Sequence, residues 1–166
     1  MALNDVETPN PADSLTQGDI FGSCPIIAFV ASEDGSYRVA EFEANLIVLT
    51  QACDLANAKT QRVQVCIVHD VQTIIAQGVV TANVVRDQVR NHRVFGWYFL
   101  PEHQPMISES IVDLRDIHTL PRTMLEQFAS SGKRIGRLIP PYREHMAQHF
   151  ATTFSRIALP QPYSTT

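Results

Sequence analysis

The stretch that decides the fold is segment 46–55, Leu46-Ile47-Val48-Leu49-Thr50-Gln51-Ala52-Cys53-Asp54-Leu55. It begins with a fully apolar run, which is typical of a buried strand. A hydroxyl, an amide, a thiol and a carboxylate follow this run. Functional side chains are commonly placed where a buried strand ends, because the scaffold there is rigid and the next residues are free. The segment therefore predicts a site at the end of a strand and leaves its chemistry open.

The composition is that of one globular domain. The chain has 166 residues, of which 45% are hydrophobic and 18% charged, and one core usually spans about 100–200 residues. The formal net charge of −4 argues against a general polyanion binder. The charge is uneven, since residues 1–60 carry nine acids and two bases, and residues 61–166 carry eight acids and eleven bases. Two clusters could each form a local basic face, namely Arg86, Arg90 and Arg93, and Lys133, Arg134, Arg137 and Arg143.

The cysteines and the hydropathy pattern indicate in which cellular compartment the protein is expected. Cys24, Cys53 and Cys66 are an odd number of thiols, and the chain shows no signal-peptide pattern. Free thiols in a reducing cytoplasm are therefore expected. No apolar run approaches the roughly 18–20 residues of a membrane helix, so we expect no membrane association.

Apolar runs and turn residues predict the order of the elements. The expected strands are 25–31, 37–44, 46–50, 63–68, 94–100, 110–114, 117–120 and 135–139. Of these, 25–31, 46–50 and 63–68 are expected to be buried, and Asp34-Gly35 predicts a turn after the first strand. The expected helices are 71–77, with Asp70 as its N-cap, 81–91, 122–130 and 142–158. Residues 1–16 and 159–166 hold little to bury and are expected to be flexible, so that a single domain spans residues 17–158.

This order indicates a fold that is mainly β with some α. A regular βαβ alternation, which would indicate a doubly wound sheet, is absent. The last helix carries an apolar stripe suited to packing on strands, formed by Tyr142, Met146, Phe150, Phe154 and Ile157. We therefore expect a small SH3-like barrel with inserted helices and a C-terminal amphipathic helix.

Four segments resemble the PemK/MazF toxins, namely Gly18-Asp19-Ile20-Phe21, Leu46–Thr50, Val63–Val68 and Ser110–Ile117. Members of that family are small SH3-like barrels, usually dimeric, that cleave single-stranded RNA as the toxin half of toxin–antitoxin pairs. The resemblance covers roughly two thirds of the chain. It implies a homodimer, a protein partner such as an antitoxin, and a role in a bacterial or phage conflict system. The closing stretch Pro140–Pro160 is instead similar to a tail shared by uncharacterised bacterial proteins.

The chain departs from the family where the reaction takes place. The toxins place an arginine just before the strand that Leu46–Thr50 matches, where it stabilises the pentavalent phosphate and transfers protons. This chain has Ala44 and Asn45 there. The toxins also carry Ser or Thr at the end of the next strand, where this chain has the segment 68–70, Val-His-Asp. The barrel can therefore be inherited without the reaction, because fold does not determine function.

The candidate catalytic residues follow from what RNA cleavage without a metal or cofactor requires, namely a base, an acid and a cation for the phosphate. Histidine is the side chain suited to acid and base work near neutral pH, so His69 is the candidate, and Asp54 or Asp70 could orient it. We predict His69 as acid and base, Asp54 as its orienting group or as the base, and Arg62 or Arg86 as the phosphate ligand. The RNA-binding candidates are Thr50, Gln51, Arg86, Arg90 and Arg93. If the chain is an enzyme, it is expected to be a metal-independent endoribonuclease.

Three other interpretations stay open at this point. The first is a metal site. Cys66-x-x-His69 has the spacing of zinc ligands, which Cys53 and Cys24 could complete, and His145 and His149 lie one helical turn apart and could share a metal. The apolar strand around Cys66 instead favours a structural role for this cysteine as a small buried apolar side chain. Cys53 could be a nucleophile, although no glycine-rich elbow or cationic neighbour activates it. The third is a non-catalytic adaptor in which the loop after Thr50 and the last helix bind a protein partner. A salt-sensitive affinity for RNA would separate the adaptor from the nuclease.

Overall fold

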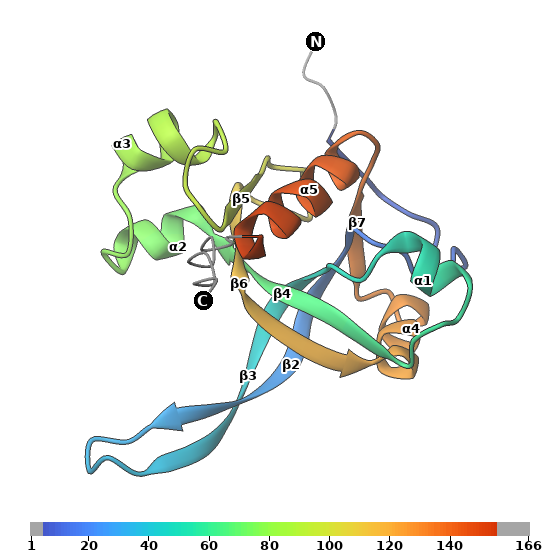
Figure 1. Cartoon of the computed structure of the whole chain (residues 1–166), viewed down its shortest axis with the longest axis horizontal. Coiled ribbons are helices and arrows are strands. Elements are labelled where there is room, and N and C mark those ends of the chain that lie inside the picture. The colour runs from blue at the N-terminus through green and yellow to red at the C-terminus, as the bar shows by residue number, and fades with distance from the viewer. Residues whose placement is uncertain (1–4, 156–166) are drawn as a thin grey trace, which may run out of the picture.

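The computed structural model describes residues 5–155 (Figure 1). The strands are β1 (Val6–Glu7), β2 (Asp19–Ala31), β3 (Tyr37–Val48), β4 (Arg62–Asp70), β5 (Trp97–Leu100), β6 (Ser110–Pro121) and β7 (Arg134–Leu138). The helices are α1 (Ala52–Ala56), α2 (Val71–Ala76), α3 (Ala82–Val84), α4 (Arg122–Ser130) and α5 (Tyr142–Phe154), with a π-helical turn η1 (Val85–Val89) after α3. None of these helices is long and apolar enough to cross a membrane.

The strands form one antiparallel sheet in the order β1-β7-β2-β3-β4-β6-β5. With 39% of the described residues in strands and 27% in helices, the prediction of a mainly β domain is confirmed. The sheet is open, since β1 and β5 lie at its two edges. Barrel closure, which we expected from the sequence, is therefore not seen within residues 5–155.

The centre of the sheet is buried on both faces. Side chains of a strand alternate between faces, so neighbours such as Leu46 and Ile47 enter different hydrophobic clusters. Helix α5 covers one face through the fully buried Met146. Helix α4 covers the other face through Leu125 and Ala129. The long apolar runs of β3 and β4 follow from this burial on both sides.

Beyond this core, β2 and β3 continue as a two-stranded ribbon, residues 24–44, which projects from the body (Figure 1). β2 pairs with β7 only as far as Phe21, and β3 pairs with β4 only from Asn45 onward. A β-bulge between Phe21 and Cys24 marks the point of departure. Bulges bend a strand and increase its twist, so the bulge turns the ribbon away from the neighbouring strands.

The ribbon corrects one prediction about burial. The Asp34-Gly35 turn and both strands form as expected. The expectation of a buried strand at 25–31 is wrong for its outer half, because Ile27 and Phe29 are 68% and 79% exposed. Apolar composition alone cannot distinguish a strand in the core from a strand that carries an apolar surface.

The N-terminal segment is held by a buried ion network, although we expected residues 1–16 to be flexible. Strand β1 pairs with β7, and residues 1–4 lie outside the described range. The carboxylate of Asp19 is fully buried and accepts hydrogen bonds from Arg134 at 3.0 Å and Arg137 at 2.5 Å. Arg134 also donates to the carbonyl oxygens of Asn10 and Asp13. Two arginines that we assigned to a basic face therefore anchor the segment.

The helices largely follow the sequence prediction. Helix α4 spans Arg122–Ser130 as expected, and α2 begins after Asp70. The last helix is described to Phe154, and the remainder of the predicted helix 142–158, like the predicted tail 159–166, lies outside the described residues.

Candidate functional site

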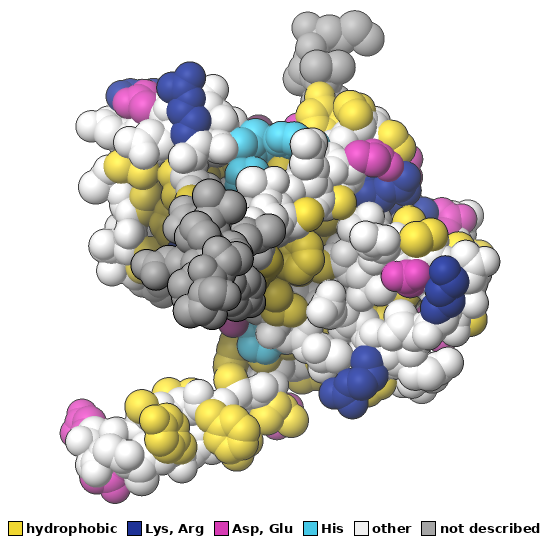
Figure 2. All heavy atoms as spheres, viewed as in Figure 1, with side chains coloured by type: hydrophobic (Ala, Val, Ile, Leu, Met, Phe, Trp, Pro, Cys, Tyr) yellow, Lys and Arg dark blue, Asp and Glu magenta, His cyan; other side chains and the backbone are white. Residues whose placement is uncertain are grey.

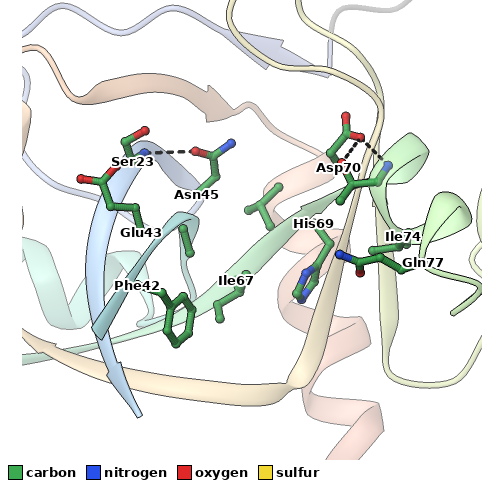
Figure 3. Close-up of a pocket in the computed structure, with 12 residues that line it drawn as sticks. Ser23, Phe42, Glu43, Asn45, Ile67, His69, Asp70, Ile74 and Gln77 are labelled. Atoms are coloured by element: carbon green, nitrogen blue, oxygen red, sulfur yellow. Dashed lines mark hydrogen bonds between the residues drawn. The ribbon is translucent and has the colours of Figure 1, made fainter. Parts of the chain in front are cut away.

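A groove opens at the base of the ribbon, where β3 and β4 separate (Figure 3). It encloses about 370 Å³ between the ribbon, the end of β4 and helix α2. A smaller hollow of about 150 Å³ adjoins it and shares His69, Ile74 and Gln77 with it. We call the larger hollow the His69 groove, because His69 is the titratable side chain that the two hollows share.

The groove combines an apolar part with polar groups. Phe42, Ile67 and Ile74 supply the large apolar side chains. The polar residues of the lining are Ser23, Glu43, Asn45, His69, Asp70, Thr73 and Gln77. The described lining thus holds two carboxylates and no Lys or Arg. Binding of RNA depends on cations that contact phosphate, so the charge of the groove favours a neutral or basic ligand.

Asp70 positions helix α2, which forms one wall of the groove. Its carboxylate accepts a hydrogen bond from the backbone N–H of Thr73 at 2.7 Å and from the hydroxyl of Ser108 at 2.5 Å. The bond from Ser108 is the largest cause that lowers the pKa of Asp70, and the bonds at the helix start add to it. Because this carboxylate is committed to capping, it is not free to orient His69.

The opposite wall depends on Asn45. Its side-chain oxygen accepts a hydrogen bond from the backbone N–H of Ser23 at 3.1 Å (Figure 3). Ser23 lies in the bulge of β2 with a φ of 48°, a conformation that is uncommon for residues other than glycine. Asn45, which occupies the position where the resemblance implies a reactive arginine, therefore supports the bulge.

The structure does not bring the three predicted catalytic residues together. His69 lies near the end of β4, whereas Arg62 begins that strand. Asp54 is in α1, on the connection that leads from β3 back to the start of β4. At about 3.3 Å per residue, the length of β4 separates Arg62 from His69 by roughly 20 Å. Asp54 contacts Lys59 and Cys53 instead of His69 among the described residues, so its orienting role stays a prediction that these contacts do not support.

The polar loop after Thr50 closes the corner between β3 and β4. The Thr50 hydroxyl accepts a hydrogen bond from the backbone N–H of Gln64 at 2.7 Å. Gln51 precedes α1, where its side-chain oxygen lies 3.6 Å from the Cys53 thiol. Asp54 lies 3.6 Å from the Nζ atom of Lys59. These contacts account for the polar residues of the loop within the fold, and none of them lines the His69 groove.

The predicted RNA-binding arginines are mostly engaged by carboxylates. Arg86 bonds to Asp87 at 2.7 Å, and Arg90 bonds to Glu109 at 2.5 Å. Arg93 is exposed. None of the three arginines lines the His69 groove.

The three thiols do not converge on a metal site. Cys24 and Cys66 are buried in the clusters on opposite faces of the sheet, and Cys53 is exposed. Burial raises the pKa of Cys24 to about 11 and that of Cys66 to about 12. Within residues 5–155, no three His, Cys, Asp or Glu side chains are placed to hold a metal ion.

A second titratable cluster joins α5 to the segment between η1 and β5, and Figure 2 shows histidine side chains gathered there. The ring centroid of His92 lies 4.6 Å from that of Tyr98, 4.8 Å from that of His145 and 6.1 Å from that of His149. The Tyr98 hydroxyl lies within hydrogen-bond distance of His145 Nδ1 at 3.2 Å. His92 has a φ of 53°, and its buried Nδ1 has no hydrogen-bond partner in the described chain. Burial, followed by repulsion from His145 and His149, lowers the pKa of His92 to about 4.

Comparison with known proteins does not assign the chain to a family, because no family model matches it and no curated protein matches it.

The sequence indicated His69 and Asp70, and the resemblance drew attention to Ala44 and Asn45, but the other residues of the groove were not indicated. The signal that could have found Asn45 is a polar residue directly before the apolar run of β3. Phe42 and Gln77 carried no signal of their own, because an aromatic residue in a strand and an amide at a helix end usually serve the fold. The His92 cluster was also missed beyond the pair His145 and His149, since the contact that adds His92 is tertiary.

Proposed function

We propose that this domain is a protein-interaction module that binds an extended segment of a partner polypeptide along the His69 groove. The observation that carries the proposal is the separation of β3 from β4 beyond the pair Asn45–Val68. From Tyr37 to Ala44, β3 pairs only with β2 among the strands of residues 5–155. An open edge of this kind presents backbone donors and acceptors that an added strand can satisfy.

The lining of the groove indicates the chemistry of the partner segment. Alternate side chains of an added strand point to the same face, so every second residue would enter the groove. Phe42, Ile67 and Ile74 would contact an apolar side chain. The exposed carboxylate of Glu43 makes no ion pair in the described chain and suits a neighbouring Lys or Arg. We therefore expect an extended partner segment in which an apolar residue lies next to a Lys or Arg.

A second candidate function is the binding or cleavage of single-stranded RNA by a PemK/MazF-like domain in a bacterial or phage conflict system. It is supported by the groove itself, because Asn45 and His69 occupy the two positions where the resemblance implies reactive residues. Phe42 is 40% exposed and could stack on a base. The SH3-like barrel, the homodimer and metal-independent cleavage at His69 belong to this proposal. The absence of Lys and Arg from the described lining makes it the weaker of the two.

One experiment separates the two candidates. A photoreactive phenylalanine analogue replaces Phe42, and the control carries the same analogue in place of Met106, which is 50% exposed and lines none of the hollows around the ribbon. After irradiation in the native cell, the adducts are treated with protease or ribonuclease and identified by mass spectrometry. We expect adducts at position 42 that are polypeptide, enriched over position 106. Ribonuclease-sensitive adducts would favour the RNA function, and equal adducts at both positions would contradict a site in the groove.

A further inference from the structure

The ribbon carries an exposed apolar face that is separate from the His69 groove. Ile27, Phe29, Tyr37 and Val39 are 68%, 79%, 76% and 62% exposed. In the register of β2 and β3, Phe29 lies opposite Val39, and Tyr37 lies opposite Ala31. Residues that face each other across a ladder share one side of the sheet, so the four side chains form one surface, and Figure 2 shows hydrophobic atoms along the ribbon. Phe42 pairs with Ile26 and lies on the other side.

This apolar surface is large for a two-stranded ribbon whose face is open to water. Two aromatic and two aliphatic side chains at these exposures present roughly 500 Å² of apolar area, near the upper end of patches on monomeric proteins. An isolated two-stranded hairpin is at best marginally stable in water. A partner that covers the face would remove this area from water and hold the ribbon in place.

The charges of the ribbon indicate which partner. The ribbon and its turn carry the carboxylates of Glu33, Asp34, Glu41 and Glu43, against one guanidinium, Arg38. None of the four carboxylates forms an ion pair with a described residue. Two copies of this acidic ribbon packed face to face would repel each other, whereas a basic partner would be attracted.

We infer that this face docks a basic amphipathic helix of another protein. A sheet face is covered by a helix or by a second sheet, and the like charges disfavour the ribbon of a second copy. From Ile27 to Ala31 the face extends roughly 13 Å, which matches about nine residues of helix. Phe29 and Tyr37 contact the apolar stripe of that helix, and the carboxylates beside them meet its Lys or Arg residues. The inference goes beyond the proposed function, because it uses the opposite face of the ribbon.

The test uses the full chain and two synthetic helical peptides as probes. Both have the same leucine stripe, which is flanked by lysine in one peptide and by glutamate in the other. Binding is measured by fluorescence anisotropy at low and moderate salt, and the contact surface is mapped by amide chemical shifts. The protein variants are Phe29→Ser and Glu41→Lys, with Met106→Ser as the control for loss of an exposed apolar side chain. Phe42→Ser tests whether the groove is involved instead.

We expect the lysine peptide to bind at least about tenfold more tightly than the glutamate peptide, with an affinity that falls as salt rises. Phe29→Ser should weaken binding about thirtyfold, as for an aromatic hot spot, and Glu41→Lys should also weaken it. Met106→Ser and Phe42→Ser should leave binding unchanged.

The inference is overturned if the lysine peptide does not bind, if both peptides bind equally, or if Phe42→Ser rather than Phe29→Ser removes binding. It is also overturned if the protein alone dimerises through the ribbon and Phe29→Ser abolishes the dimer. Failure of the crosslinking at position 42 would contradict the proposed function and leave this inference intact.

Discussion

Asn45 and Val68 form the last pair of the ladder between β3 and β4, and the two strands separate beyond it. The side chain of Asn45 also accepts the hydrogen bond from Ser23 in the bulge of β2. One residue therefore ends the ladder and supports the bend that turns the ribbon outward. The open edge of β3, the His69 groove and the exposed ribbon all follow from this arrangement.

The Asp70 cap is expected to hold the wall of the groove. Asp70→Ala removes the acceptor at the start of α2 and should reduce the free energy of unfolding by about 1–2 kcal/mol, measured by urea denaturation. Asp70→Asn is the matched control, because asparagine caps a helix about as well as aspartate. Equal losses in the two variants would show that the charge of Asp70, rather than the cap, stabilises this region.

The buried Asp19 network is expected to dominate the stability of the N-terminal segment. Asp19→Asn leaves Arg134 and Arg137 without their buried counter-charge, so the free energy of unfolding should fall by about 3–5 kcal/mol. Asp87→Asn, which breaks the exposed pair with Arg86, should produce no measurable change. A loss at Asp19 no larger than that at Asp87 would contradict the importance of the buried network.

The His92 cluster predicts a loss of stability in mild acid. Its environment lowers the pKa of His92 from 6.5 to about 4 and also lowers that of His149. The folded state therefore favours neutral rings, and protonation favours the unfolded state. The contribution of these neutral rings to the free energy of unfolding is complete above pH 6.5 and should be lost as the pH drops from 6.5 toward 4. Thermal unfolding at a series of pH values measures this window.

His92→Asn provides the control for the pH effect, because asparagine tolerates the positive φ at this position and does not titrate. The variant should depend less on pH between 6.5 and 4 than the wild type does. Asp70 does not confuse the result, because its pKa lies below its ordinary value of 3.8 and its contribution is lost only at lower pH. An unchanged slope in His92→Asn would assign the effect to other groups.

The thiols are expected to react in two classes. Cys53 is exposed and should react with a thiol reagent in the native protein, whereas Cys24 and Cys66 are buried with raised pKa values and should react only after denaturation. Mass spectrometry should find one label on the folded chain and three labels on the unfolded chain. Native labelling of Cys24 or Cys66 would show that the sheet opens.

The core and the order of elements could be predicted from the sequence because they depend on local patterns. The apolar run at Leu46, the Asp-Gly turn at Asp34 and the cap at Asp70 each correspond to the expected element. The burial of β2 could not be predicted, because Phe29 has the same residue type in a core and on a ribbon surface. The bulge between Phe21 and Cys24 and the end of the β3–β4 ladder at Asn45 decide between the two locations.

The candidate site was harder to predict because it depends on register. The sequence placed Asp54 and His69 at the ends of successive strands, which left open whether those ends are adjacent. In an antiparallel pair, the end of the first strand lies beside the start of the second. Asp54 therefore lies on the connection that leads to the start of β4, and His69 lies near the place where β3 enters the sheet.

Amide hydrogen exchange across β3 tests the central claim most directly. It is measured in the free protein and in the presence of a peptide selected on the wild type from a random display library. We predict that every second amide of Tyr37–Ala44, the one that points to the open edge, exchanges rapidly in the free protein. The amides of Asn45–Val48 should be protected whichever neighbouring strand they point to. Saturation with the peptide should protect the rapidly exchanging amides, as expected when a strand is added to the edge. Uniform protection of Tyr37–Ala44 in the free protein, or no change on saturation, would contradict the account.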